Sequence, residues 1–148
     1  MSDYTKYTFE QLAELKSGTK LHDEFDESIR FIILRGPASL TAYIGIADDH
    51  PLADFDYDSI PIDCHGGFTY SRKGIGNSLP VGYWWYGWDY AHAGDACFYD
   101  LKSNSTFRQT ERRWVLKEVI DDAWDTKYEF NKLMKLVNEI TQKVKSCH

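Results

Sequence analysis

Apolar side chains recur along this chain with two different periods, and each period predicts a different kind of element. Runs rich in β-branched and aromatic residues predict strands at 30–35 and 40–47, joined as a hairpin through the turn residues 36–39. Two further strands are expected at 62–71 and 82–89. The simplest arrangement of these four runs is one antiparallel sheet.

A short helix is expected near the N-terminus, at residues 8–16. Thr8 and Gln11 can form a capping box at its start, and Gly18 follows its end. The polar stretches between the other elements are expected to be loops, and the first of them is rich in aspartate and therefore solvated. These loops are 48–58, 72–80 and 91–105.

The C-terminal part repeats apolar residues at steps of three and four, which predicts helices at 113–124 and 127–144. Asp125 and Thr126 are expected to cap or bend the second helix. The apolar face of that helix has two uses that the sequence leaves open. It can pack on the sheet, or it can form the seam of a homodimer, because its period is close to a heptad.

Together these elements predict a single α+β domain, in which an antiparallel sheet packs against C-terminal helices and a short N-terminal helix. The expected boundaries are 1–20 for the N-terminal helix, 28–100 for the sheet region and 108–146 for the C-terminal helices. A chain of 148 residues has the size of one ordinary domain, and its apolar content of 43% is ample for a core.

Charge and composition narrow the range of partners. The net charge is −6 and the basic residues gather only at Arg108, Arg112 and Arg113, so duplex DNA is not an expected partner. The longest apolar run, 31–34, is too short to span a membrane, and the N-terminus lacks a signal-peptide pattern. The cytoplasm is therefore the expected compartment, in which the three cysteines would be free thiols.

The most distinctive segment, residues 63–95, is rich in glycine, histidine and aromatic side chains. Gly66 and Gly67 inside a predicted strand indicate a bulge or the close approach of another backbone, a ring or a ligand, or else room for a neighbouring tryptophan. Strand alternation divides the aromatic run between two faces. One face carries Tyr83, Trp85 and Asp89, and the other carries Trp84, Tyr86 and Trp88. One set can fill the core, and the other either covers a pocket or adds to a thick aromatic core.

Four polar residues of this segment, His65, Asp89, His92 and Asp95, are candidates for chemistry. Imidazoles and carboxylates together suit Zn²⁺ and similar ions, but no pair here has the spacing of a strong metal motif. They also suit an acid–base pair in which an aspartate orients an imidazole. A polar network that only holds the loop in place is the third alternative. We predict no metal and no cofactor.

The segment also resembles a family of small uncharacterised proteins found in phages, prophages and bacteria. The residues that carry the resemblance are 65–70 (HGGFTY), 84–95 (WWYGWDYAHAGD), 44–46, 49–52 and Trp114. The resemblance covers roughly residues 40–125, and the helix to Val144 is longer than the usual tail of that family. It implies a phage accessory or anti-defence context rather than an established reaction.

These features make a non-catalytic binding protein the first functional hypothesis. A small nucleotide-like ligand would stack on indole rings, while polar side chains would contact its phosphate, ribose and base. The predicted ligand-binding residues are His65, Tyr70, Arg72, Trp85, Trp88, Asp89, His92 and Asp95. In a phage setting, such a protein would sequester an immune signal in the host cytoplasm.

Two other functions stay open at this point. In one, the protein is a hydrolase of a phosphoester or glycosidic bond, with His65, His92 and Asp95 as its catalytic residues. In the other, it inhibits a host defence protein through the acidic loop 48–58 and exposed aromatic side chains.

Overall fold

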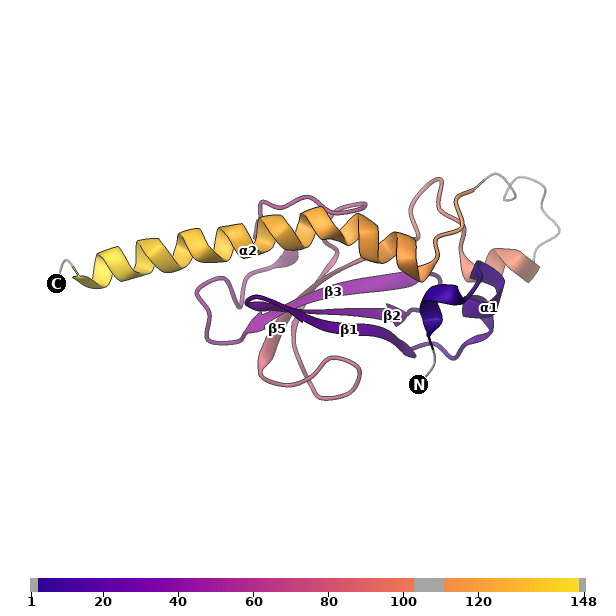
Figure 1. The fold of residues 1–148 in the computed structure, drawn as a ribbon, viewed down its shortest axis with the longest axis horizontal. Coiled ribbons are helices and arrows are strands. Elements are labelled where there is room, and N and C mark those ends of the chain that lie inside the picture. Colours follow the sequence, from indigo (N-terminus) through magenta and orange to yellow (C-terminus); the bar gives the residue numbers. More distant parts are fainter. Residues whose placement is uncertain (1–2, 103–110, 147–148) are drawn as a thin grey trace.

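Five antiparallel strands form one sheet in the order β1-β2-β3-β5-β4 within residues 3–102 and 111–146, the part of the chain that this computed structural model describes. A long helix, α2, crosses one face of the sheet, and the short helix α1 lies at one end of it (Figure 1). The predicted α+β domain is therefore confirmed. The helices and strands are α1 Phe9–Glu14, β1 Lys20–Asp26, β2 Ile29–Arg35, β3 Leu40–Ala47, β4 Tyr70–Lys73, β5 Tyr83–Asp89 and α2 Leu116–Ser146, and the short 3-10 segments are Tyr4–Lys6, Tyr57–Ser59 and Phe98–Lys102.

Strand β3 lies in the middle of the sheet. It pairs with β2 on one side, in the predicted hairpin, and with β5 on the other. Gly45 of β3 lies opposite Trp85 of β5. A Cβ atom on Gly45 would lie 2.6 Å from the Trp85 ring, closer than packed atoms approach each other. Glycine at this position is therefore what lets a tryptophan lie across the neighbouring strand.

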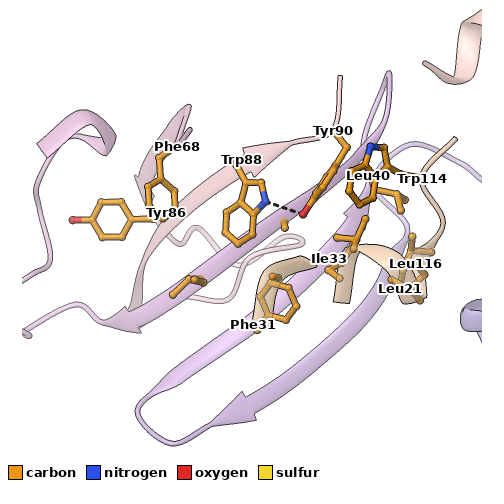
Figure 2. Packing of buried hydrophobic residues seen from close by; sticks show 14 of the residues in the cluster. Leu21, Phe31, Ile33, Leu40, Phe68, Tyr86, Trp88, Tyr90, Trp114 and Leu116 are labelled. Carbon is orange, nitrogen blue, oxygen red and sulfur yellow. Dashed lines mark hydrogen bonds between the residues drawn. The ribbon is translucent and has the colours of Figure 1, made fainter. Parts of the chain in front are cut away.

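Both faces of β5 are buried, and this answers the question that the aromatic run leaves open. Tyr86 and Trp88 lie on the α2 side, packed with Phe68 and Phe130 (Figure 2). Trp85 lies in a second, smaller core on the opposite face. That core also contains Ile32, Leu34 and Leu79. The predicted alternation is confirmed, and the aromatic surplus is spread over two cores.

Helix α2 is one continuous helix, so the two C-terminal helices expected from the sequence are wrong. Neither Asp125 nor Thr126 interrupts it, because each carries only a modest helix penalty and both keep their backbone amides, unlike proline. Thr126 is buried, and its hydroxyl donates to the Asp63 carbonyl at 2.9 Å. Packing against the body of the domain therefore holds the helix together where its local sequence is weakest.

Helix α2 has two halves with different surroundings. Its first half buries Val119, Ala123 and Phe130 against the sheet. Its second half reaches beyond the sheet into solvent (Figure 1). There Leu136, Ile140 and Val144 are each more than half exposed, at 52%, 53% and 56%.

Strand β1 is missing from the sequence prediction because it is polar and carries no apolar run. It is an edge strand, and charged residues are typical of such edges. Its charges are paired: Asp23 accepts from Arg30 of β2 at 2.8 and 2.9 Å, and Glu24 accepts from the buried Lys127 of α2. Contacts with residues far along the chain, rather than local pattern, stabilise this strand.

The strand expected at 62–71 is wrong over most of its length, since β4 begins at Tyr70. Residues 64–67 form a turn instead, in which the Gly67 amide donates to the Cys64 carbonyl at 3.0 Å. Gly66 and Gly67 have φ values of +71° and +82°, which residues with a side chain rarely adopt. The two glycines therefore mark a turn and not a bulge within a strand.

Other local predictions fare better. Helix α1 runs over residues 9–14, slightly shorter than expected, and both hydrogen bonds of the capping box between Thr8 and Gln11 are present. No helix among the described residues is long and apolar enough to cross a membrane. The end of the loop expected at 91–105, together with Arg108 and Cys147, lies outside the described residues.

Because the two halves of α2 have different surroundings, truncating an apolar side chain in each half should lower the free energy of unfolding by different amounts. Phe130→Ala removes a fully buried ring, and we expect the free energy of unfolding to fall by about 3–5 kcal/mol. Leu136→Ala, less than two turns further along, changes an exposed side chain and should alter it by less than about 0.5 kcal/mol. Urea unfolding of both variants measures the difference, and equal losses would contradict this view of α2.

Candidate functional site

Two segments that are 30 residues apart meet at the end of β5, beside the start of α2. One is the turn 63–67, which is tied to α2 by the hydrogen bond from Thr126 to Asp63. The other is the loop that follows β5, in which the Asp95 amide donates to the His92 carbonyl at 2.8 Å. A short bridge between Asp95 and Arg112 brings Trp114 to the same place. The site therefore depends on three separate parts of the chain.

Asp95 is the centre of this site, and its side chain is only 6% exposed. Its Oδ2 atom accepts from His65 Nε2 at 2.6 Å and from the His92 amide at 3.0 Å, and its Oδ1 atom accepts from Trp114 Nε1 at 2.8 Å. Burial by itself raises the pKa of a carboxyl group. The hydrogen bonds from His65, Trp114 and the His92 amide outweigh burial and hold the pKa of Asp95 below its usual value.

His65 is oriented by its neighbours as well as by Asp95. Its ring stacks on Tyr90, with centroids 4.7 Å apart and planes 11° apart, and it meets the Trp114 ring edge-on at 5.1 Å. A carboxylate only accepts hydrogen bonds, so Nε2 is the protonated nitrogen in this contact. Nδ1 has no hydrogen-bond partner among residues 3–102 and 111–146. The neutral ring therefore presents a free lone pair at Nδ1.

His92 lies directly over Gly66. A Cβ atom on Gly66 would lie 2.2 Å from His92 Cε1, whereas a Cβ atom on Gly67 would meet nothing within 4 Å. Gly66 therefore lies against a neighbouring ring, but that ring is the imidazole of His92 and not the tryptophan named in the sequence interpretation. His92 Nδ1 is buried without a hydrogen bond among the described residues, 3.7 Å from both Asp89 Oδ1 and Asp95 Oδ2.

Tyr90 and Cys64 form the inner wall of the site. Tyr90 donates from its hydroxyl to Asp122 of α2 at 2.7 Å and accepts from Trp88 Nε1 at 3.1 Å (Figure 2). Burial, followed by the charge of Asp122, raises the pKa of the Cys64 thiol to about 12. Cys64 is therefore protonated near neutral pH, which excludes it as a thiolate nucleophile.

The structure brings together half of the ligand-binding residues predicted from the sequence. His65, Asp89, His92 and Asp95 form the cluster described above. Trp85 and Trp88 are buried in separate cores and leave no indole surface on which a ligand could stack. Tyr70 packs edge-on against Tyr43 in the smaller core, and Arg72 is exposed on β4 opposite Trp85.

Three residues of the site, Tyr90, Trp114 and Asp122, are absent from the site predicted from the sequence. Trp114 is noticed in the sequence only through the family resemblance, since a single tryptophan before a helix has many structural explanations. Tyr90 belongs to the distinctive segment 63–95, but no local pattern assigns it or Asp122 to the site, because their hydrogen bond joins the end of β5 to α2.

The electrostatic character of the site is acidic. Asp89, Asp95 and Asp122 lie in or next to it. Arg112 places a cation beside the site, with its guanidinium carbon 3.5 Å from the centre of the Trp114 ring, but it is also paired with Glu118. Such a site suits a cation or an uncharged, hydroxyl-bearing molecule better than a bare phosphate, because like charges repel.

The low pKa of Asp95 leads to a prediction on stability. Asp95→Asn removes hydrogen bonds to a charged group, and we expect a loss of about 1.5–3 kcal/mol at pH 7. Because the pKa of Asp95 is lower in the folded protein than in the unfolded chain, its contribution is complete above about pH 4 and is lost as the pH falls through the folded pKa.

Urea unfolding at several pH values measures this effect. The gap between wild type and Asp95→Asn should be widest near neutral pH and should close in acid. The exposed Asp49 provides a control, since Asp49→Asn should show no comparable gap. A gap for Asp95→Asn that is the same at all pH values would contradict the assignment.

Comparisons of the chain with protein-family models, with curated proteins and with solved structures find no match. The resemblance to a family of phage, prophage and bacterial proteins therefore stays a prediction. The chemistry of the site rests on its own geometry, in which a buried carboxylate orients one imidazole and lies beside a second.

Proposed function

We propose that the protein is a hydrolase that works by acid–base chemistry, with His65 as general base and Asp95 as the residue that orients it. The observation that carries this proposal is the hydrogen bond of 2.6 Å from His65 Nε2 to Asp95, which leaves Nδ1 free to accept a proton. Imidazoles are the side chains that most often transfer protons near neutral pH. Asp95 would stabilise the charged ring that forms.

His92 supports the same proposal as the general acid. The His92 ring lies close to two carboxylates, Asp89 and Asp95, which would stabilise a positive charge on it. The rings of His65 and His92 are 5.4 Å apart, so a small group can contact both. Water would lose a proton to His65 Nδ1 and attack the substrate carbon, while His92 would give a proton to the leaving oxygen or nitrogen.

The acidic surroundings favour one class of substrate. A phosphoester would bring negative charge next to Asp89 and Asp95, whereas a glycosidic bond is uncharged. We therefore favour a glycosidic bond, including the one between ribose and base in a nucleoside-like molecule. In a protein that binds its ligand without turnover, the same polar side chains can bond ribose hydroxyls. Such a non-catalytic binder, or sponge, would also need rings on which a nucleotide base can stack, and the burial of Trp85 and Trp88 removes that surface.

Turnover distinguishes the hydrolase from the sponge. The purified chain is incubated with nitrophenyl glycosides, nucleosides and ADP-ribose derivatives, and products are separated by chromatography. We expect hydrolysis of a member of this panel, with a loss of about 10²–10⁴-fold in rate for His65→Gln or His92→Gln. His50→Gln, which changes a histidine that contacts Asn138 outside the site, should keep the wild-type rate. Recovery of intact, bound ligand from the wild type would favour the sponge, and full activity in His65→Gln would refute its role as base.

A surface for protein partners is favoured by one further observation. In the acidic loop, Phe55 and Tyr57 are about half exposed and alternate with Asp54, Asp56 and Asp58. Exposed aromatic rings among like charges suit a basic protein partner. Inhibition of a host defence protein would use this loop, and the phage context of that hypothesis rests on the family resemblance alone.

The free thiols of Cys64 and Cys97 are consistent with the proposed location of the protein in the cytoplasm.

A second copy of the chain is the partner that suits the projecting half of α2. Leu133, Val137, Ile140 and Val144 follow one another at steps of four, three and four, which is the spacing of a coiled-coil seam. A seam of about three helical turns buries less area than a standard interface, so we expect weak, concentration-dependent dimers.

Analytical ultracentrifugation over a range of concentrations tests the dimer. Ile140→Glu places a charge in the seam and should make the chain monomeric. Gln142→Glu adds the same charge two residues away at an exposed position outside the seam and should leave association unchanged. A wild-type chain that is monomeric at every concentration would exclude the dimer.

A further inference from the structure

The buried Nδ1 atom of His92 is the feature of the site that acid–base chemistry explains least. It has no hydrogen bond among the described residues, and two carboxylate oxygens lie 3.7 Å away, beyond hydrogen-bond length. Leaving a buried polar atom unpaired is costly. An atom in this position, facing two carboxylates, is well placed to share a positive ligand with them.

The positions of the donor atoms fit a metal ion. His65, His92 and Asp95 each offer one ligand atom, and these three atoms lie within 4.8 Å of one another. Around a tetrahedral Zn²⁺ ion with bonds of about 2.0–2.1 Å, ligand atoms are separated by about 3.3 Å. Two of the observed separations, 2.6 and 3.7 Å, lie on either side of that value. Small side-chain movements are therefore enough to place all three atoms around one ion.

We propose that His65 Nε2, His92 Nδ1 and Asp95 Oδ2 form a site for a divalent transition metal such as Zn²⁺. Two imidazoles with a carboxylate are donors that suit such ions better than they suit Ca²⁺ or Mg²⁺. The ion also neutralises the excess negative charge of the site.

The surroundings of these donors match those of metal ligands. Trp114 Nε1 donates to Asp95 Oδ1, and the His92 amide donates to Asp95 Oδ2. The carboxylate is therefore fixed in place before any ion binds. The close approach of Gly66 fixes the His92 ring, because no side chain fits between them. Outer contacts of this kind orient metal ligands and raise their affinity.

The metal site also regulates the proposed hydrolase, and this consequence rests on the proposed function. His65 Nε2 holds either the proton that it shares with Asp95 or the metal, but not both. When the metal takes Nε2, the proton of the neutral ring moves to Nδ1, and Nδ1 can no longer accept a proton from water. Metal-bound protein is therefore the inactive form, and removal of the ion restores the base.

Direct binding tests the site independently of any activity. The full chain is treated with a chelator and titrated with Co²⁺, whose visible absorption reports tetrahedral coordination, and Zn²⁺ is then added in competition. We expect one equivalent of Co²⁺ to bind and Zn²⁺ to displace it. His65→Gln and His92→Gln should each weaken binding by more than the roughly 10–100-fold that is typical for the loss of an outer contact. His50→Gln should bind like the wild type.

Two glycine variants give a matched pair for the geometry. Gly66→Ala and Gly67→Ala both place a side chain in left-handed backbone, but only Gly66→Ala pushes into the His92 ring. Metal binding should weaken in Gly66→Ala and persist in Gly67→Ala, with circular dichroism used to verify folding of each. Should Gly66→Ala fail to fold, His92→Gln decides the same point.

The outcomes separate the metal site from the hydrolase. No tetrahedral Co²⁺ spectrum in the wild type, or wild-type affinity in both His65→Gln and His92→Gln, overturns the metal site and leaves the hydrolase proposal standing. Metal binding without turnover of any glycoside overturns the hydrolase and leaves the metal site standing. If both are observed, Zn²⁺ should abolish turnover and chelator should restore it, and unchanged turnover at saturating Zn²⁺ would overturn the regulatory role.

Discussion

The burial of both faces of β5 is the constraint on which the rest of the structure depends. Tyr86 and Trp88 point to one side and Trp85 to the other, so a cover over one face alone would leave large rings in water. The smaller core around Trp85 covers one face, and Gly45 provides the space that its indole needs. Helix α2 covers the other, where its Phe130 packs against Phe68 and Tyr86.

The same packing creates the site. When α2 lies across the sheet, its first turns come beside the end of β5, where Asp122 accepts from the Tyr90 hydroxyl. Trp114, just before the helix, then reaches Asp95, and Tyr90 and Trp114 enclose the His65 ring. A polar network, an acid–base pair and a metal site are therefore not competing positions in the fold. The proposed base and the proposed metal site would use the same few atoms, and the proton or ion bound to His65 would decide between them.

Helix α2 combines a structural role with a surface that the domain itself does not cover. Its first half is anchored by Phe130 in the core and by the ion pair of Lys127 with Glu24 on β1. Its second half continues the apolar spacing beyond the sheet, at Ile140 and Val144. These exposed apolar positions are the surface that the proposed dimer would bury.

The sequence by itself determined the features that arise between near neighbours. The β2–β3 hairpin, the alternation along β5 and the capping box of Thr8 and Gln11 follow from side-chain period and turn chemistry. It also located the polar residues of the site within one stretch, 63–95. Only the tertiary structure decided that both faces of β5 are covered, that β1 is a strand and that Trp114 completes the site. These features depend on contacts between residues far apart in the sequence, such as His65 with Asp95 and Glu24 with Lys127. No local pattern of residues predicts the free energy of such contacts.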